Sequence, residues 1–85
     1  MSLQVFFFLD KSTVQPGEMV GFTITIYNLF DRDVSAEWTL TLNGSELKRD
    51  RVQIKARSWV DISSGFKAPT QAGSYQVCAD AKVIG

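Results

Sequence analysis

QPGEMVGFTITIYN, residues 15–28, decides the fold. Pro16 at the second position of a turn, followed by Gly17, favours a type II turn at its start. After the turn, apolar residues alternate with small or polar ones, which is typical of a strand that buries one face. The predicted buried face holds Val20, Phe22, Ile24 and Ile26. We therefore expect a central strand of an antiparallel all-β domain over about residues 18–28.

Other strand-like segments surround this stretch, with turn signals about every 8–12 residues, a spacing typical of a sandwich or small barrel. One hairpin is especially clear, because Asn43-Gly44 joins two β-runs and suits a type I′ turn. The same residues match an N-glycosylation sequon, but the turn explains them more simply. No segment repeats apolar residues at helical spacing over three turns. The remaining predicted strands cover residues 3–9, 34–42, 45–48, 51–56, 59–66 and 75–83.

The composition is that of one globular domain spanning residues 1–85, with nine basic and nine acidic residues. Because these charges cancel, we expect no nucleic-acid partner on the basis of net charge. The longest apolar run, Val5 to Leu9, is far shorter than the ~20 residues that cross a bilayer. We therefore expect no membrane span. The compartment stays open: cell surface or extracellular for a module of an exported protein, cytoplasmic if the chain is complete.

Catalysis is disfavoured by what the sequence lacks. Histidine is absent, and Cys78 is the single cysteine, so neither a Ser-His pair nor an intrachain disulfide can form. The chain has no Gly-x-Ser-x-Gly elbow, no GxGxxG and no phosphate loop. We therefore expect no enzyme, no catalytic residue, no cofactor and no metal. A calcium site at Asn28, Asp31 and Asp33 is a weaker alternative to loop capping by the same side chains.

Three segments together resemble a known family. Val14-Gln15-Pro16-Gly17-Glu18 leads into the alternating strand, residues 39–44 close a hairpin, and Ala72-Gly73-Ser74-Tyr75-Gln76-Val77 opens a late strand. The chain resembles immunoglobulin-like sandwiches of the prokaryotic cell-adhesion-related and CARDB type, whose architecture is similar to fibronectin type III domains. The resemblance implies an immunoglobulin-like antiparallel β-sandwich of six to seven strands, and a non-catalytic module often found at cell surfaces.

Two residues match positions of that fold. The resemblance implies that Trp38 is the core tryptophan of the third strand. It also implies that the Tyr75 hydroxyl caps backbone a few residues upstream. Cys78 lies one residue beyond the position of the cysteine in antibody-type domains, so it is expected to point away from the core.

The resemblance also exposes a departure. Such sandwiches have one more strand after the segment that ends at Val83, so residues 75–83 should form an unpaired edge. Residues 3–9 could fill the gap, a second copy could pair along it, or a strand from elsewhere could complete it. Residues 3–9 are apolar on both faces, which fits a strand covered on both sides and hence either of the first two solutions.

We expect a non-enzymatic structural or interaction module whose partner is another protein or itself, as a homo-oligomer. The alternative is a binding module for an anionic glycan, nucleic acid or acidic protein, since five of nine basic residues fall within residues 48–57. Charge that protects an edge strand explains the same residues more simply. The self-association candidates are Phe6, Phe8, Cys78, Asp80 and Lys82. The candidates for partner contact are Leu29, Phe30 and Trp59, and those for an anionic ligand are Lys48, Arg49, Arg51, Lys55 and Arg57.

The predicted core combines the dry faces of all the strands. Its members are Val20, Phe22, Ile24, Ile26, Val34, Ala36, Trp38, Leu40, Val52, Ile54, Val60, Ile62, Phe66, Tyr75, Val77 and Ala79.

Overall fold

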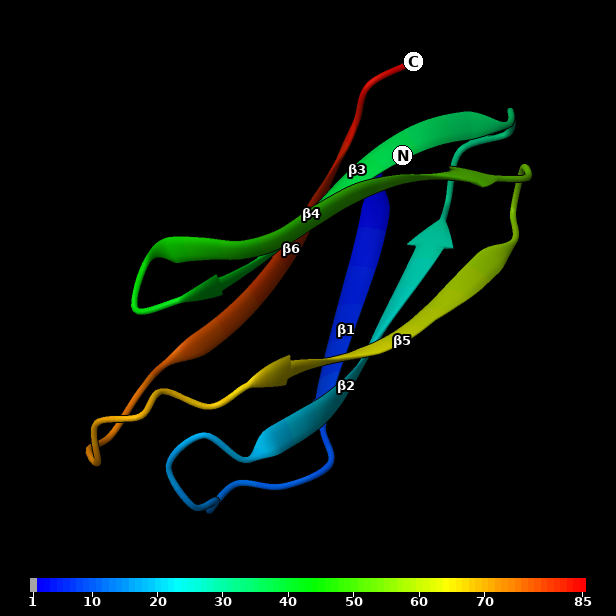
Figure 1. Ribbon diagram of the computed structural model, residues 1–85. Coiled ribbons are helices and arrows are strands. Elements are labelled where there is room, and N and C mark those ends of the chain that lie inside the picture. Colours follow the sequence, from blue (N-terminus) through cyan, green and yellow to red (C-terminus); the bar gives the residue numbers. More distant parts are fainter. Residues whose placement is uncertain (1) are drawn as a thin grey trace.

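Six strands form two antiparallel three-stranded sheets in the computed structural model, which describes residues 2–85. The strand orders are β1-β2-β5 and β4-β3-β6, and the two sheets pack face to face (Figure 1). This confirms the predicted all-β antiparallel sandwich, with the lower of the two predicted strand numbers. No helix within residues 2–85 is long and apolar enough to cross a bilayer. The strands are β1 (Leu3–Leu9), β2 (Met19–Asn28), β3 (Val34–Leu42), β4 (Ser45–Ile54), β5 (Trp59–Lys67) and β6 (Val77–Val83).

β2 is the middle strand of its sheet, as its alternation predicts. It pairs with β1 on one side and β5 on the other, and its four predicted core residues are buried. The turn before it is type II: the Glu18 amide donates to the Gln15 carbonyl at 3.1 Å, and Gly17 has φ of 77°. Local turn chemistry and side-chain alternation therefore agree along this whole stretch.

The β3–β4 hairpin closes through the predicted type I′ turn. Asn43 and Gly44 both have positive φ, at 49° and 85°, as that turn requires. The register shifts between Leu40 and Thr41, which pair with Lys48 and Glu46, so Leu47 has no residue opposite it on β3. This β-bulge places Lys48 on the same side of the sheet as Leu40.

The buried core agrees with the prediction at its centre and differs at its rim. Val52, Val60, Ile62, Val77 and Ala79 are only half-buried, because they lie on the edge strands β4, β5 and β6, which have a neighbour on one side only. Tyr75 as a core residue is wrong: it precedes β6 and is 38% exposed. Ala68, just after β5, is buried and was not predicted.

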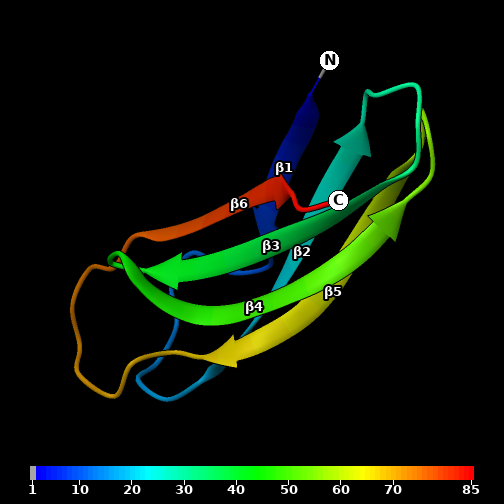
Figure 2. The ribbon, with the colours of Figure 1, turned by 90° about the horizontal axis from the view of Figure 1, so that it is seen from above.

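The position of β1 rules out one predicted solution to the missing strand. Residues 3–9 do not fill the gap beside β6, because β1 pairs with β2 in the opposite sheet, from Leu3 opposite Asn28 to Leu9 opposite Phe22. Within the single chain, β1 is covered on its inner face only. Its outer residues Phe6 and Phe8 are 53% and 64% exposed. β1 and β6 border one side of the sandwich, and β4 and β5 border the other (Figure 2).

Asn28, at the end of β2, ties two loops to the sandwich. Its side chain is fully buried. The Nδ2 group lies 2.9, 3.0 and 3.1 Å from the carbonyls of Arg32, Ile54 and Lys55, and Oδ1 accepts from the Phe30 amide at 2.9 Å. Buried polar groups need such partners, because an unsatisfied one carries a large desolvation cost.

We predict that Asn28→Ala lowers the free energy of unfolding by about 2–4 kcal/mol, because it leaves buried backbone groups without partners. The matched control is Thr25→Ala, which removes an exposed hydrogen bond to Asp61 and is expected to cost less than about 1 kcal/mol. Urea denaturation of both variants measures the difference. Equal loss in the two variants would contradict the structural role of Asn28.

Candidate functional site

β6 is an edge strand with one free edge. β6 pairs with β3 alone, and no other strand of residues 2–85 lies along its second edge. The Ile84 amide donates to the Ser35 carbonyl, and the Asn43 amide donates to the Gln76 carbonyl, both at 2.8 Å. Even-numbered residues of this segment therefore direct their backbone groups to β3.

The odd-numbered residues of β6 face the other way. Because hydrogen-bonded and non-hydrogen-bonded pairs alternate in an antiparallel ladder, their amides and carbonyls point to the free edge. Such a row of groups is a template for another strand. The residues that present it are Val77, Ala79, Ala81 and Val83.

The side chains of these same four residues point inward and are only half-buried. They pack against the core from one side of the sandwich, where the inner side chains of β1 are also half-buried. An added strand beside β6 would extend the sheet and cover this apolar strip further. The contribution from β1 consists of Leu3, Val5, Phe7 and Leu9.

The edge of β4, on the opposite side of the sandwich, is protected against added strands. β4 carries the bulge at Leu47 and outward-facing Arg49 and Arg51, and its Lys48 and Asp50 lie opposite the core residues Leu40 and Trp38. Bulges and charges, including charges on the inner side of a strand, are common devices that keep edges from pairing. β1 has neither charge nor proline, and β6 has one residue of each sign, Asp80 and Lys82.

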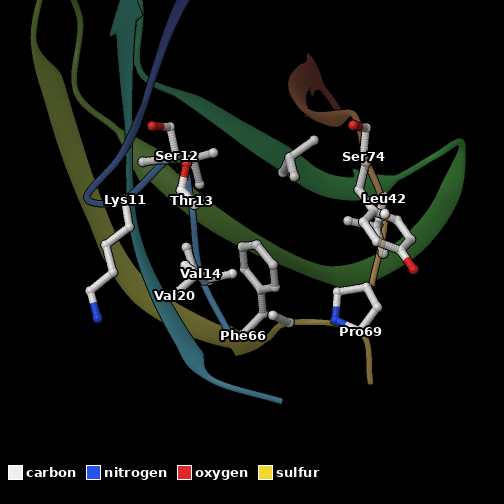
Figure 3. A pocket seen from close by; sticks show the side chains of 14 residues that line it. Lys11, Ser12, Thr13, Val14, Val20, Leu42, Phe66, Pro69 and Ser74 are labelled. Carbon is white, nitrogen blue, oxygen red and sulfur yellow. The ribbon is translucent and has the colours of Figure 1, made fainter. Parts of the chain in front are cut away.

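A cavity of about 410 Å³ opens at one end of the sandwich, where Leu9 of β1 and Val77 of β6 both contribute to its wall. In Figure 3, Ser12, Thr13 and Val14 line one wall, and Leu42, Pro69 and Ser74 line the other. The ionisable side chains among the lining residues are Lys11 and Tyr75, and each already has a partner. The Tyr75 hydroxyl donates to the Gln71 carbonyl at 2.6 Å, the upstream backbone cap that the resemblance implies.

Lys11 is held by Glu18, which fixes the loop between β1 and β2. Their Nζ and Oε2 atoms are 2.6 Å apart, and Glu18 Oε1 accepts from the Gln15 amide at 2.9 Å. The hydrogen bond from Lys11, followed by that from Gln15, lowers the pKa of Glu18. The hydrogen bond to Glu18 in turn raises the pKa of Lys11. The pair therefore holds the loop between β1 and β2 in place.

Phe6, Tyr27 and Trp59 form an aromatic row across the outer face of the β1-β2-β5 sheet. The ring centroids of Phe6 and Tyr27 are 5.7 Å apart at 82°, and those of Tyr27 and Trp59 are 6.2 Å apart at 39°. Trp59 is 52% exposed, as its position opposite the dry face of β5 predicts. The alternation of β2 could have identified Tyr27 as an outer residue, but the register that joins the three rings is not visible in the sequence.

The other two predicted contact residues lie in the loop between β2 and β3. Leu29 is exposed, whereas Phe30 is half-buried, packs against the core and has the Arg32 guanidinium carbon 5.2 Å from its ring centroid. Phe30 thus closes one end of the sandwich. Among the described residues, no aromatic contact joins Phe30 to Trp59.

The five basic side chains of residues 48–57 do not lie together on one face of the molecule. Arg49 lies 2.7 Å from Glu46 and 3.3 Å from Glu37, and Arg57 lies 2.8 Å from Asp31. The buried carboxylate of Glu37, which the sequence did not single out, also draws Arg51 and Lys82 to within 4 Å. Lys48 lies on the inner side of β4, and Lys55 lies in the turn after it.

The candidate calcium ligands are occupied by structural hydrogen bonds. Asn28 is fully buried and bonded to backbone, Asp31 pairs with Arg57, and Asp33 Oδ1 accepts from the Ala56 amide at 2.8 Å. Among the residues described, no group of three or more acidic or cysteine side chains could hold a metal ion. Cys78 is exposed and unpaired on the outer side of β6, next to Asp80 and Lys82 on the same face.

No known protein family, curated protein or solved structure matches this chain.

We predict that the Glu18 carboxylate titrates below the range of a glutamate in an unstructured peptide. Because the pKa of Glu18 is lowered by folding, its carboxylate stabilises the folded state at neutral pH. This stabilisation is lost as the pH falls through the pKa of Glu18 in the folded state. Side-chain carboxyl NMR during an acid titration measures the midpoint. Lys11→Met should move that midpoint upward, and an unchanged midpoint in this variant would contradict the role of the pair.

Proposed function

We propose that this chain is a non-enzymatic interaction module that self-associates by pairing strands along the free edge of β6. The observation that carries the proposal is the row of outward backbone groups on Val77, Ala79, Ala81 and Val83, in a strand with a neighbour on one side only. Main-chain hydrogen bonds along such an edge supply affinity, and the alternate side chains supply specificity.

The free edges of β4 and β5 are less suited to accept a strand than that of β6. β4 carries a bulge and charges on both sides of the sheet. β5 carries one residue of each sign, Asp61 and Lys67, as β6 does, but it borders the protected β4 rather than the unprotected β1. The β1 edge is equally unprotected, but β1 borders the same side of the sandwich as β6. An added strand at β6 therefore lies next to both unprotected edges and extends the cover over the half-buried apolar strip between them.

The cavity at the end of the sandwich has a structural part in this proposal. Its two ionisable lining residues, Lys11 and Tyr75, are both engaged in hydrogen bonds that hold loops in place. Acid–base catalysis requires a titratable group free to reach a substrate proton. The cavity lies at the end of the apolar strip, where Leu9 and Val77 contribute to its wall.

We predict that raising the protein concentration protects the amides of Val77, Ala79, Ala81 and Val83 from hydrogen exchange. At low concentration these amides exchange quickly, whereas those of Cys78, Asp80 and Lys82 are already protected by β3. Amide NMR, with sedimentation on the same samples, measures both properties up to about 1 mM, where an association of about −4 kcal/mol is half complete.

The edge of β5 provides the matched control. The Asn28 amide donates to the Ser58 carbonyl, so even-numbered residues of β5 face β2 and the amides of Asp61 and Ser63 face solvent. These two amides should stay unprotected at every concentration. A monomer throughout the range, or new protection confined to β1, would contradict the proposed function.

A further inference from the structure

We infer that the strand accepted by β6 is β6 of a second copy, in one register, with a two-fold axis through Ala81. This inference rests on the proposed function and specifies its partner. The result is a continuous six-stranded sheet in the order β4-β3-β6-β6-β3-β4. Closed two-fold association of this kind uses the same surface on both copies.

The pleat restricts which registers are possible. Directly opposite residues of an antiparallel pair point to the same face, so inner residues must oppose inner residues. A two-fold axis must then pass through a residue and cannot lie between two. Every such register also places odd-numbered residues opposite one another, so the edge-facing backbone groups always meet. Backbone pairing alone therefore does not choose among the axes.

The two outward charges of β6 make the choice. An axis through Asp80 places Asp80 opposite Asp80 of the second copy, and an axis through Lys82 opposes the two lysines. An axis through Ala79 or Cys78 leaves both charges opposite uncharged residues. An axis through Ala81 places each Asp80 opposite Lys82 of the other copy, twice per dimer.

The geometry of the ladder strengthens this preference. Asp80 and Lys82 direct their backbone groups to β3, so across the new interface they form non-hydrogen-bonded pairs. Side chains approach more closely in such pairs than in hydrogen-bonded ones. Opposite charges are favourable and like charges unfavourable at these positions. Lys82 is 3.7 Å from Glu37 in the single chain, and its side chain is exposed enough to reach a second carboxylate.

The inner face fits the same register. With the axis at Ala81, Ala81 opposes its own copy and Ala79 opposes Val83, so small residues lie at the centre of the interface. Val77 then lies opposite Gly85, whose carbonyl already accepts from the Ser35 amide at 2.9 Å, and Cys78 lies opposite Ile84. All these residues are within β6 or the extended segment after it, where Ile84 still bonds to Ser35.

Charge reversal tests the register directly. Asp80→Lys and Lys82→Asp each create two like-charged pairs in the dimer and should weaken self-association by at least about tenfold. The double variant D80K/K82D restores both pairs and should associate like the unchanged chain. An equimolar mixture of the two single variants should form a mixed dimer, because each then supplies the charge that the other lacks. Thermal unfolding confirms that each variant is folded.

Cross-linking provides a second measure that does not depend on charge. Ile84→Cys places a cysteine opposite the native Cys78 of the other copy, whereas within one chain the two lie about 20 Å apart along the strand. Oxidation should give a covalent dimer, and Ile84→Cys combined with Cys78→Ser should not.

The outcomes separate the two proposals. If the unchanged chain stays monomeric, the proposed function and this inference both fail. If it dimerises through the β6 edge amides, but the single charge variants associate equally well or the mixed dimer does not form, only the register is overturned. Cross-linking of I84C with charge sensitivity supports the axis through Ala81.

Discussion

Burial of alternate β2 side chains between the two sheets is the constraint on which the rest of the structure depends. Val20, Phe22, Ile24 and Ile26 occupy the centre of the core, and β2 has a neighbour along both edges. A shift of one residue in its pairing would turn this whole set toward solvent. β1 and β5 are therefore fixed in register by β2, and the opposite sheet is positioned by packing on the same four side chains.

Local chemistry accounts for the features that the sequence could predict. The two turns depend on residues adjacent in the chain, Pro16-Gly17 and Asn43-Gly44, so their types follow from backbone preferences alone. The strands follow from side-chain alternation. The core was predicted well where a strand has two neighbours and less well on edge strands, because exposure there depends on what lies beside the strand.

Long-range pairing accounts for what the sequence could not predict. Asn28 bonds to backbone 26 and 27 residues away, and Glu37 draws basic residues from β4 and β6. The aromatic row needs the register of three strands at once. The candidate site was predicted in part for the same reason. The unpaired edge followed from counting strands. The protection of the β4 edge could not be predicted, because the bulge and the inner charges depend on the register between β3 and β4.

The same constraint explains why one side of the molecule is available for association. The middle strands β2 and β3 have a neighbour on each side. β1 and β6 have unprotected edges, and the apolar strip between them is only half-buried. The most direct test is an NMR sample that mixes two differently labelled copies and detects contacts between chains only. Self-association through β6 predicts contacts between residues of β6 in the two copies, and the axis at Ala81 predicts that these include the α-protons of Asp80 in one copy and Lys82 in the other. Contacts that connect only β1 residues, or none at any concentration, would contradict it.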